Sequence, residues 1–289
     1  MPGLLSNLYT KPFNVLPMKT ILATTDFSKA SENAMHYAAE LALFTHAKLV
    51  IFHSYTIPVP VTEVPIVTLP FEEMEKINTA LLKSFDKKLK AKYGKLETEL
   101  ITRPGFVVDE IITLAEQKHA DLIVMALTGA GNAFALLGSN TTSIMKKLKQ
   151  PVLAIPHDAK FKKPLKIALA CDYKTITPDD VVSKFTDFVK QFGAKVLVLD
   201  VLKKAESVSY QTALAEVNLE NSLGNLEHSL HFPSGDDLEK EVNTFVKNNH
   251  VDILTVMPHN YSFFSGLFHH SGAKKIALAI QVPILSIHE

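Results

Sequence analysis

Several features are scarce in this sequence, and each scarcity excludes a class of protein. One cysteine, Cys171, rules out an intramolecular disulfide framework and fits a reducing compartment. No apolar run approaches the roughly 20 residues of a membrane span, and residues 1–17 lack the apolar core of a signal peptide. Thirty basic and thirty acidic residues cancel, so no overall field attracts nucleic acid or an anionic membrane. We therefore expect a cytoplasmic protein with no nucleic-acid or membrane partner.

The chain does have enough apolar residues for a sizeable core. Hydrophobic residues make up 47% and charged residues 21% of its 289 residues, which is ordinary for a globular protein. A single core rarely grows beyond roughly 250 to 300 residues, so two domains are expected. The periodic pattern begins at Met18, and we interpret residues 1–17 as an N-terminal extension.

Short runs rich in Val, Ile and Leu alternate with longer segments of helical period, a pattern that predicts βα units and a parallel sheet. Asp26 and Ser28 are both candidate N-caps for the first helix, and Gly94 is expected to end the second. Strands are predicted at residues 19–25, 47–55, 96–102, 120–126 and 151–156, and helices at residues 26–47, 71–94, 107–120 and 140–149.

The same order repeats in the second half of the chain. LKIALACDY parallels KTILATTDF, with Asp172 in the place of Asp26. GAKVLVLDV parallels HAKLVIFHS, and Asp252 answers Asp121 before the fourth strand. Similarity at domain length indicates duplication of a whole domain, since a solenoid repeats every 20 to roughly 50 residues.

The junction between the two copies is predicted at HDAKFKKP, a short charged linker over residues 157–164. We therefore expect an N-terminal domain over residues 18–157 and a second domain over residues 163–289.

A glycine-containing segment follows the fourth predicted strand. It reads MALTGAGNAFALLGSNTTSIM, residues 125–145. In open parallel sheets, ligands bind beyond the carboxyl ends of the strands where strand order reverses, so this segment and Asp26 should lie at one edge. Its glycines permit close backbone approach to a ligand, and Gly138 and Ser139 open a helix whose amides suit phosphate.

Two better-known phosphate grips are absent from this segment. There is no G-x-x-x-x-G-K-[ST], and GAGNAF does not complete G-x-G-x-x-G after the first strand. Glycines that only form a tight turn and a helix start explain the segment as well as a ligand does.

Taken together, ILATTDFSKASENAMHYAAELA and residues 120–156 resemble the universal stress protein family, and the doubled pattern resembles its tandem members. The resemblance is strong over residues 18–157 and weaker over residues 163–288. It implies an α/β fold of two tandem doubly wound domains, each a five-stranded parallel sheet in the order 3-2-1-4-5 flanked by helices. It also implies ATP or another adenine nucleotide at the carboxyl edge, with Mg²⁺ as an optional companion ion.

The resemblance assigns candidate binding residues. Nucleotide-binding members carry G-x-x-G, nine residues, then G-[ST]. Here Ala126 stands at the first glycine, Gly129 matches the second, and only eight residues separate Gly129 from Gly138. The implied nucleotide-binding set is Thr25, Asp26, Ile51, His53, Ala126, Leu127, Gly129, Gly138, Ser139, Asn140 and Thr141.

Phosphate is expected on the amides of Gly129, Gly138 and Ser139 and on the hydroxyls between Ser139 and Thr141, with Asp26 near the adenosine. The shorter segment leaves occupancy open, because a phosphate cradle needs aligned amides.

Ala126 is a second departure from the family pattern. Its methyl group is tolerable at negative φ and harmful at positive φ.

The second half departs further from the family pattern. Counted from Asp252, the three glycine positions hold Met257, Asn260 and His270, although Ser271 remains. These side chains would fill the space of the phosphates, so we expect this half to be retained for packing and pairing, without a nucleotide.

Other chemistry-bearing residues do not assemble into a site. His259 and His270 have no accompanying C-x-x-C or H-E-x-x-H, and no metal site is expected. Cys171 ends a predicted strand and is interpreted as a buried structural thiol. No set of nucleophile, base and orienting residue emerges from the sequence.

Two functions follow as hypotheses. The first is a cytoplasmic stress-response protein whose N-terminal domain binds ATP, ADP or AMP as a sensor or switch, with at most slow, incidental hydrolysis. The second is a nucleotide-free module that pairs its domains through the edge strands PVLAIP and VPILSI and acts through an unknown protein partner. An enzyme of adenylyl or hydride transfer is a third class, but the sequence lacks the motifs of such enzymes, and the fold alone cannot support it. The tandem arrangement imitates a homodimer within one chain and leaves room for further homodimerisation.

Overall fold

The computed structural model describes residues 16–57, 70–127, 139–171, 179–202, 219–257 and 281–288. The first half contains β1 (Thr20–Thr24), α1 (Lys29–Thr45), β2 (Lys48–Tyr55), α2 (Phe71–Tyr93), β3 (Thr98–Pro104), α3 (Val107–Gln117), β4 (Leu122–Ala126), α4 (Ser139–Lys147) and β5 (Val152–Ile155). The second half contains β6 (Lys166–Ala170), α5 (Asp179–Lys190), β7 (Lys195–Leu199), β8 (His228–His231), α7 (Leu238–Asn249), β9 (Ile253–Val256) and β10 (Ile284–Ser286).

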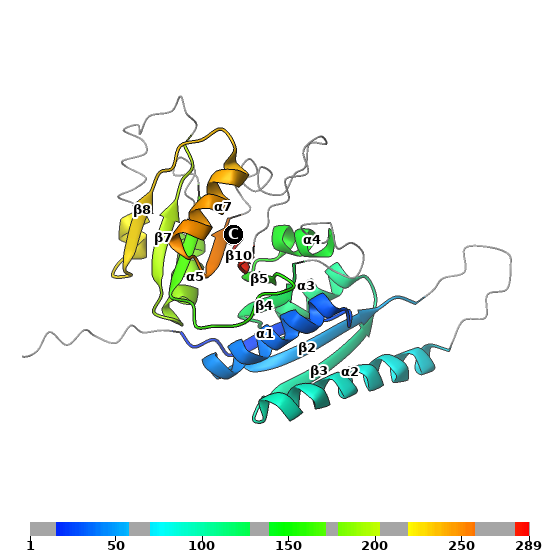
Figure 1. Ribbon diagram of the computed structural model, residues 1–289. Helices are drawn as coiled ribbons and strands as arrows, with labels where there is room; N and C mark the ends of the chain where they lie inside the picture. The colour runs from blue at the N-terminus through cyan, green and yellow to red at the C-terminus, as the bar shows by residue number, and fades with distance from the viewer. Residues whose placement is uncertain are drawn as a thin grey trace, which may run out of the picture.

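The named strands form one continuous sheet in the order β3-β2-β1-β4-β5-β10-β9-β6-β7-β8 (Figure 1). Each half has its strands in the order 3-2-1-4-5, so the predicted tandem doubly wound fold is confirmed. Pairing within each half is parallel, whereas β5 and β10 pair antiparallel and join the halves. In this pair Ile284 lies opposite Ala154, and Ser286 lies opposite Val152. The domain boundaries themselves stay a prediction.

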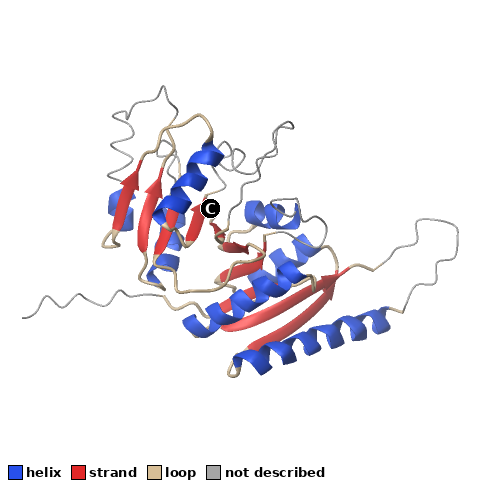
Figure 2. Cartoon of the chain, in the orientation of Figure 1, coloured by secondary structure: helices blue, strands red, loops and turns tan. Residues whose placement is uncertain are grey.

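Helices cover both faces of the sheet (Figure 2). Alternate strand residues face opposite layers, as the two-residue period of a strand requires. Ile21 packs in the layer that contains α1, α2 and α5, and its neighbour Leu22 packs in the layer that contains α3, α4 and α7. Both layers contain buried residues of both halves, so the two halves share a continuous core. In the described part of the chain, none of the helices has the length and apolar content needed to cross a bilayer.

The ends of the first two helices follow the sequence. Ser28, one of the two predicted N-caps, accepts a hydrogen bond of 3.2 Å from the Ser31 amide at the start of α1. Gly94 ends α2 with a φ of 64°, and its amide donates to the Lys90 carbonyl at 2.9 Å. The positive φ explains why a glycine stands there, and the predicted helix end is confirmed.

Asp121 and Asp252, which correspond in the two sequence repeats, make equivalent hydrogen bonds. The Asp121 carboxylate accepts the amides of Lys19 and Thr20 at 2.7 and 2.8 Å. The Asp252 carboxylate accepts the amides of residues 165 and 166 at 2.8 and 3.0 Å. Each aspartate fastens the beginning of the first strand in its half to the beginning of the fourth, at the edge opposite the predicted ligand site.

The linker between the halves is held on α1. Asn33 donates from Nδ2 to the carbonyls of Pro156 and Ala159 at 3.1 and 2.9 Å. Its Oδ1 accepts a hydrogen bond of 2.7 Å from Lys160. Because Asn33 is buried, these contacts fix where the chain leaves the first half.

Aromatic rings continue this contact into the second half. The Phe161 ring lies 5.3 Å from Tyr37 and 5.8 Å from Phe44. Phe44 also stacks on Phe192, with ring centroids 5.7 Å apart.

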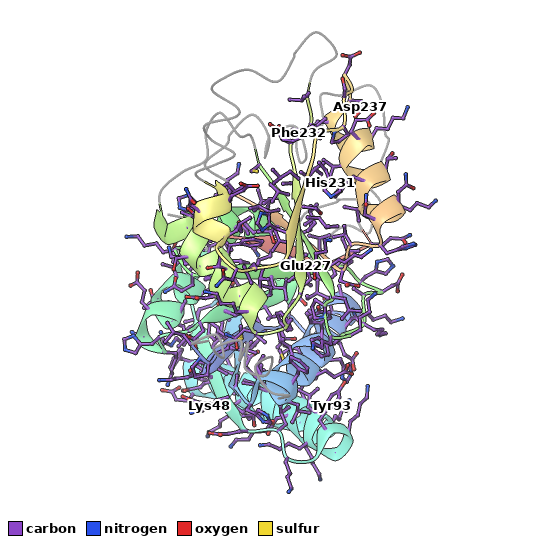
Figure 3. The ribbon with its side chains drawn as sticks, turned by 90° about the vertical axis from the view of Figure 1, so that its left-hand side faces the viewer. Lys48, Tyr93, Glu227, His231, Phe232 and Asp237 are labelled. Atoms are coloured by element: carbon purple, nitrogen blue, oxygen red, sulfur yellow. The ribbon has the colours of Figure 1, made fainter. Side chains whose placement is uncertain are left out.

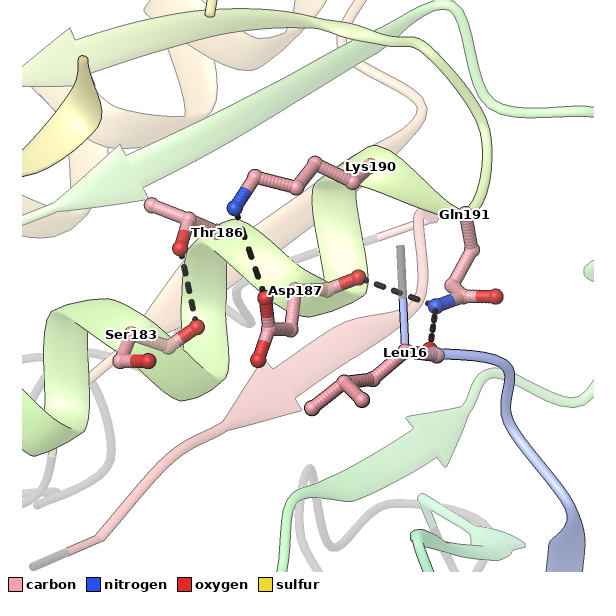
Figure 4. Close-up of polar contacts among 6 residues, drawn as sticks. All are labelled: Leu16, Ser183, Thr186, Asp187, Lys190 and Gln191. Carbon is pink, nitrogen blue, oxygen red and sulfur yellow. Dashed lines mark hydrogen bonds and ion pairs between the residues drawn. The ribbon is translucent and has the colours of Figure 1, made fainter. Parts of the chain in front are cut away.

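Gln191, the residue before Phe192, donates from Nε2 to the carbonyl of Leu16 at 2.7 Å (Figure 4). The segment that precedes β1 and the turn after α5 are therefore in direct contact.

Candidate functional site

The candidate site lies where the sheet order reverses. β1 pairs with β4, with Ala23 opposite Val124, and the chain moves outward from β1 to β2 but in the other direction from β4 to β5. Ligands of open α/β sheets bind at the carboxyl ends of strands at such a point. The predicted Asp26 follows β1 and the predicted Leu127 follows β4, so both stand at this edge.

The turn from β1 into α1 is tightly bonded around Thr25. Thr25 is buried, and its amide donates to the Phe52 carbonyl at 2.9 Å. Its hydroxyl accepts the Phe27 amide at 3.0 Å and lies 3.1 Å from the hydroxyl of Ser31. Thr25 therefore shapes the turn, and its hydroxyl is engaged by the protein.

Asp26 is exposed on the same turn. Its Oδ1 accepts the Ser28 amide at 3.0 Å, a local bond typical of a turn that leads into a helix. The next residue, Phe27, has a φ of 59°. This turn directs the chain so that the Asp26 carboxylate stays at the surface of the carboxyl edge.

His53 bridges the turn to α2. Its Nδ1 lies 2.8 Å from the Thr25 carbonyl oxygen, and its Nε2 lies 3.1 Å from Oδ1 of Asn78. Asn78 in turn donates from Nδ2 to the Met74 carbonyl at 2.8 Å. The ring of Phe27 packs against the imidazole with a centroid distance of 4.5 Å. Both ring nitrogens of His53 therefore have hydrogen-bond partners within the protein.

Ile51, the other candidate on β2, is a core residue. It is fully buried between its sheet partners Ala23 and Leu100. Its side chain therefore contributes packing beneath the edge.

The end of β4 accommodates Ala126 without strain. Ala126 is the last residue of β4, lies opposite Ile155 and does not have a positive φ. The following amide, of Leu127, donates to the Ile155 carbonyl at 2.8 Å. Because φ is not positive at Ala126, its methyl group is compatible with the main-chain conformation there.

Helix α4 is fastened to the end of β4 by one side chain. The hydroxyl of Thr141, which is buried, donates to the Ala126 carbonyl at 3.0 Å. Ser139 and Asn140, the first two residues of α4, are exposed. The first amides of a helix have no acceptor within the helix, so this end can receive an anion. Since the hydroxyl hydrogen of Thr141 is used, the hydroxyl donor expected from residues 139–141 reduces to Ser139.

Other predicted residues of this site lie outside the described part of the chain, namely Gly129, Gly138 and the intervening residues 130–137. The same holds in the second half for Asp172, His259, Asn260, His270 and Ser271.

The second half repeats the main-chain geometry with different side chains. The Cys171 amide donates to the Leu199 carbonyl at 3.0 Å, as the Thr25 amide does to Phe52. The Cys171 thiol is buried, as predicted. Met257, which takes the first glycine position, is also buried. Among the described residues, no group of three or more His, Cys, Asp and Glu side chains is placed to hold a metal.

Sequence reasoning missed three residues that build the edge, namely Phe27, Ser31 and Asn78. Asn78 could have been identified from the sequence. It is a polar residue between Met74 and Leu82 on the side of α2 that faces the sheet. Polar side chains on a buried helix face usually have a specific partner.

Comparisons with known proteins place these observations in context. Residues 17–156 match the model of the Universal stress protein family. A universal stress protein of Methanocaldococcus jannaschii is 34% identical over 157 residues, which cover 51% of this chain and 84% of that protein.

Two solved structures extend the likeness over both halves. A universal stress protein from Archaeoglobus fulgidus covers 93% of this chain and 96% of its own, with 19% identity and a TM-score of 0.67. A Pseudomonas aeruginosa protein described as functionally unknown covers 94% of this chain and 92% of its own, with 12% identity and a TM-score of 0.59. At these identities the likeness concerns the fold alone.

Proposed function

The chain belongs to the universal stress protein family, and on that premise we propose that its N-terminal half binds an adenine nucleotide as a sensor or switch ligand. The observation that carries the proposal is the hydrogen bond of 3.0 Å from Thr141 to the Ala126 carbonyl. It holds the amino end of α4 at the carboxyl end of β4, next to the β1 strand that leads to Asp26. The first amides of α4, which we propose to bind phosphate, and the Asp26 carboxylate, which we propose to bind the nucleoside, are thereby at one edge.

Each residue has a chemical role in this proposal. The phosphates accept hydrogen bonds from the first amides of α4, from the Ser139 hydroxyl and from the amides of Gly129 and Gly138. The partial positive charge of a helix amino end favours the anion. The Asp26 carboxylate accepts hydrogen bonds from the nucleoside, and Mg²⁺ is an optional companion of the phosphates.

We propose a binding role and no catalytic one, with any ATP hydrolysis slow and incidental. A general base needs a free lone pair within reach of the proton it removes. Both ring nitrogens of His53 already contact Thr25 and Asn78, so neither reaches a ligand without breaking a contact within the protein.

Calorimetry and thermal unfolding with ATP, ADP and AMP test the proposal. A ligand at one hundred times its dissociation constant stabilises a protein by about 2.7 kcal/mol, which raises the unfolding temperature measurably. Ser139→Asp places a negative charge against the phosphates and should abolish binding, whereas Ser139→Lys, its control at the same position, should retain it. No heat and no shift with any of the three nucleotides at millimolar concentration would show that the proposal is wrong.

A second function, the nucleotide-free interaction module, has its own supporting observation. Its premise was that the halves pair through PVLAIP and VPILSI, and β5 does pair with β10, with Leu285 opposite Leu153. Mass spectrometry of small molecules released from the purified chain separates the two functions. A stoichiometric nucleotide excludes the module, and its absence together with silent calorimetry supports the module.

A further inference from the structure

Helix α2 has an outer face that the other described elements leave uncovered. Of its 23 residues, only Leu82, Asp86 and Leu89 are buried. It packs on β3, β2 and α1 along its inner face. Figure 1 shows α2 along the outer edge of the molecule, beneath β3. Figure 3, in which Tyr93 marks its end, shows it at the lower end of the molecule, with Phe232 and Asp237 of the second half toward the opposite end.

Among the exposed residues of α2, one stripe along this outer face contains two aliphatic side chains. Ile77 and Leu81, one turn apart, are 44% and 49% exposed. Steps of three and four residues place side chains on the same face of a helix, and by these steps the stripe continues to Glu73 on one side and to Ser84 and Lys88 on the other. All five residues are exposed. We call these five residues the outer stripe.

The charges along α2 are opposite at its two ends. Residues 71–79 contain three glutamates and one lysine, whereas residues 80–93 contain five lysines and one aspartate. Acidic residues in the first turn and basic residues in the last turn also suit the helix dipole. The dipole does not account for Lys88, which precedes the last turn, or for two aliphatic side chains in contact with water.

The outer stripe is complementary to itself in the antiparallel direction. When two copies of α2 cross antiparallel about a point between Ala80 and Leu81, Glu73 of each copy meets Lys88 of the other. Both aliphatic side chains then lie at the centre, where Ala80 and Ser84 are small enough for the helices to approach. A two-fold interface needs the same patch to fit itself, which this order of acid, apolar and base provides.

We propose that α2 is the surface through which two copies of this chain associate, antiparallel and about a two-fold axis at the middle of the helix. The outer stripe is on the exposed side of α2, whereas Asn78 on its inner side contacts His53 at the carboxyl edge. The proposal does not depend on a nucleotide. One helix presents a short contact, so the association is of the weak, concentration-dependent class.

Sedimentation equilibrium of the full chain tests the association. The mass should rise from 31.9 kDa toward twice that value as the chain concentration increases from about 1 µM to about 1 mM, the range of a weak interface. Leu81→Glu should raise the dissociation constant at least about tenfold, because a charge replaces an apolar side chain at the centre. Leu165→Glu, at a side chain that is 65% exposed elsewhere, is the control and should leave the dissociation constant unchanged.

Charge reversal tests the antiparallel register. Glu73→Lys and Lys88→Glu each oppose like charges twice in the dimer and should weaken it. The double variant restores both pairs with reversed sign and should recover most of the association. A chain that stays monomeric throughout, a dimer indifferent to Leu81→Glu, or a double variant as weak as the sum of the single ones would each overturn the proposal. Circular dichroism of every variant checks that the fold is intact.

Discussion

The hydroxyl of Thr141 donates a hydrogen bond to the carbonyl oxygen of Ala126, 15 residues earlier in the chain. The bond joins the last residue of β4 to the first turn of α4, so both ends of the glycine segment are held at the carboxyl edge. Both partners of this bond lie near the ends of that segment, in β4 and in α4.

Replacing Thr141 should loosen this edge. Thr141→Val keeps the shape of the side chain but leaves the Ala126 carbonyl without its partner, which costs about 1–3 kcal/mol for a buried group. Urea unfolding measures the loss. Thr141→Ser retains the hydroxyl and is the control; if it is as destabilised as Thr141→Val, the hydrogen bond is not the cause.

Thr255 in the middle of β9 should tolerate an apolar replacement and gain from it. Its side chain is fully buried, and its hydroxyl has no hydrogen-bond partner among the described residues. Val124 stands at the matching place in β4, three residues after Asp121 as Thr255 is three after Asp252. We expect Thr255→Val to stabilise the protein by about 1 kcal/mol and Val124→Thr to destabilise it by about 1–3 kcal/mol. Urea midpoints that move in the same direction for both variants would contradict this account.

Acid should weaken the anchor at Asp252. Burial alone would raise the pKa of Asp252, but the Lys162 ammonium, 2.5 Å away, and the amides of Leu165 and Lys166 outweigh burial and hold this pKa below its ordinary value. A carboxyl whose folded pKa lies below its unfolded value of about 3.9 stabilises the fold above that value and loses the effect as pH falls through the folded pKa.

Asp252→Asn therefore should cost about 1–3 kcal/mol at pH 7 and progressively less below pH 4, since bonds to a charged group are lost. Urea unfolding across this range gives the difference, with exposed Asp109→Asn as the control. If the loss of stability on Asp252→Asn is independent of pH, the side chain stabilises the fold through its shape and not through its charge.

The two halves should unfold together. β5 pairs with β10, and the buried layers on both faces contain residues from each half. Leu285→Ala at the junction removes fully buried apolar atoms, at a cost of about 2–5 kcal/mol. Hydrogen exchange should then accelerate in β1 and in β6 alike, and calorimetry should show one transition at a lower temperature. Exchange that accelerates only in the second half would mean that the halves unfold separately.

Much of the fold could be predicted because it depends on apolar runs and their spacing. The strands of the first half and their order follow from such runs, and the match of Asp252 to Asp121 located the second copy. β8 was not predicted, because HSLH contains three polar side chains and a single leucine and gives no apolar run. Its neighbour in the sheet, β7, does have an apolar run and was predicted. The antiparallel pairing of β5 with β10 could not be predicted either, since edge strands of the same composition can pair in parallel or antiparallel.

The site was harder to predict than the fold. Sequence located the edge through Asp26 and the glycine segment, but it could not show which polar groups are already occupied. Thr25 and Thr141 both look like free hydroxyls in the sequence, and both are engaged by the protein. Hydrogen-bond partners of this kind depend on contacts between distant segments, and no local pattern records them.

The junction of β5 with β10 has a consequence for how the two halves can differ. A dimer of identical chains needs an edge that fits itself, and dilution separates it. In this chain β5 needs to fit only β10, and β10 only β5. The short linker keeps the two halves together at any concentration. The ratio of the halves is fixed at one to one. A change confined to one half, such as the buried Met257 where the first half has Ala126, therefore alters one member of each pair and leaves the other as it was.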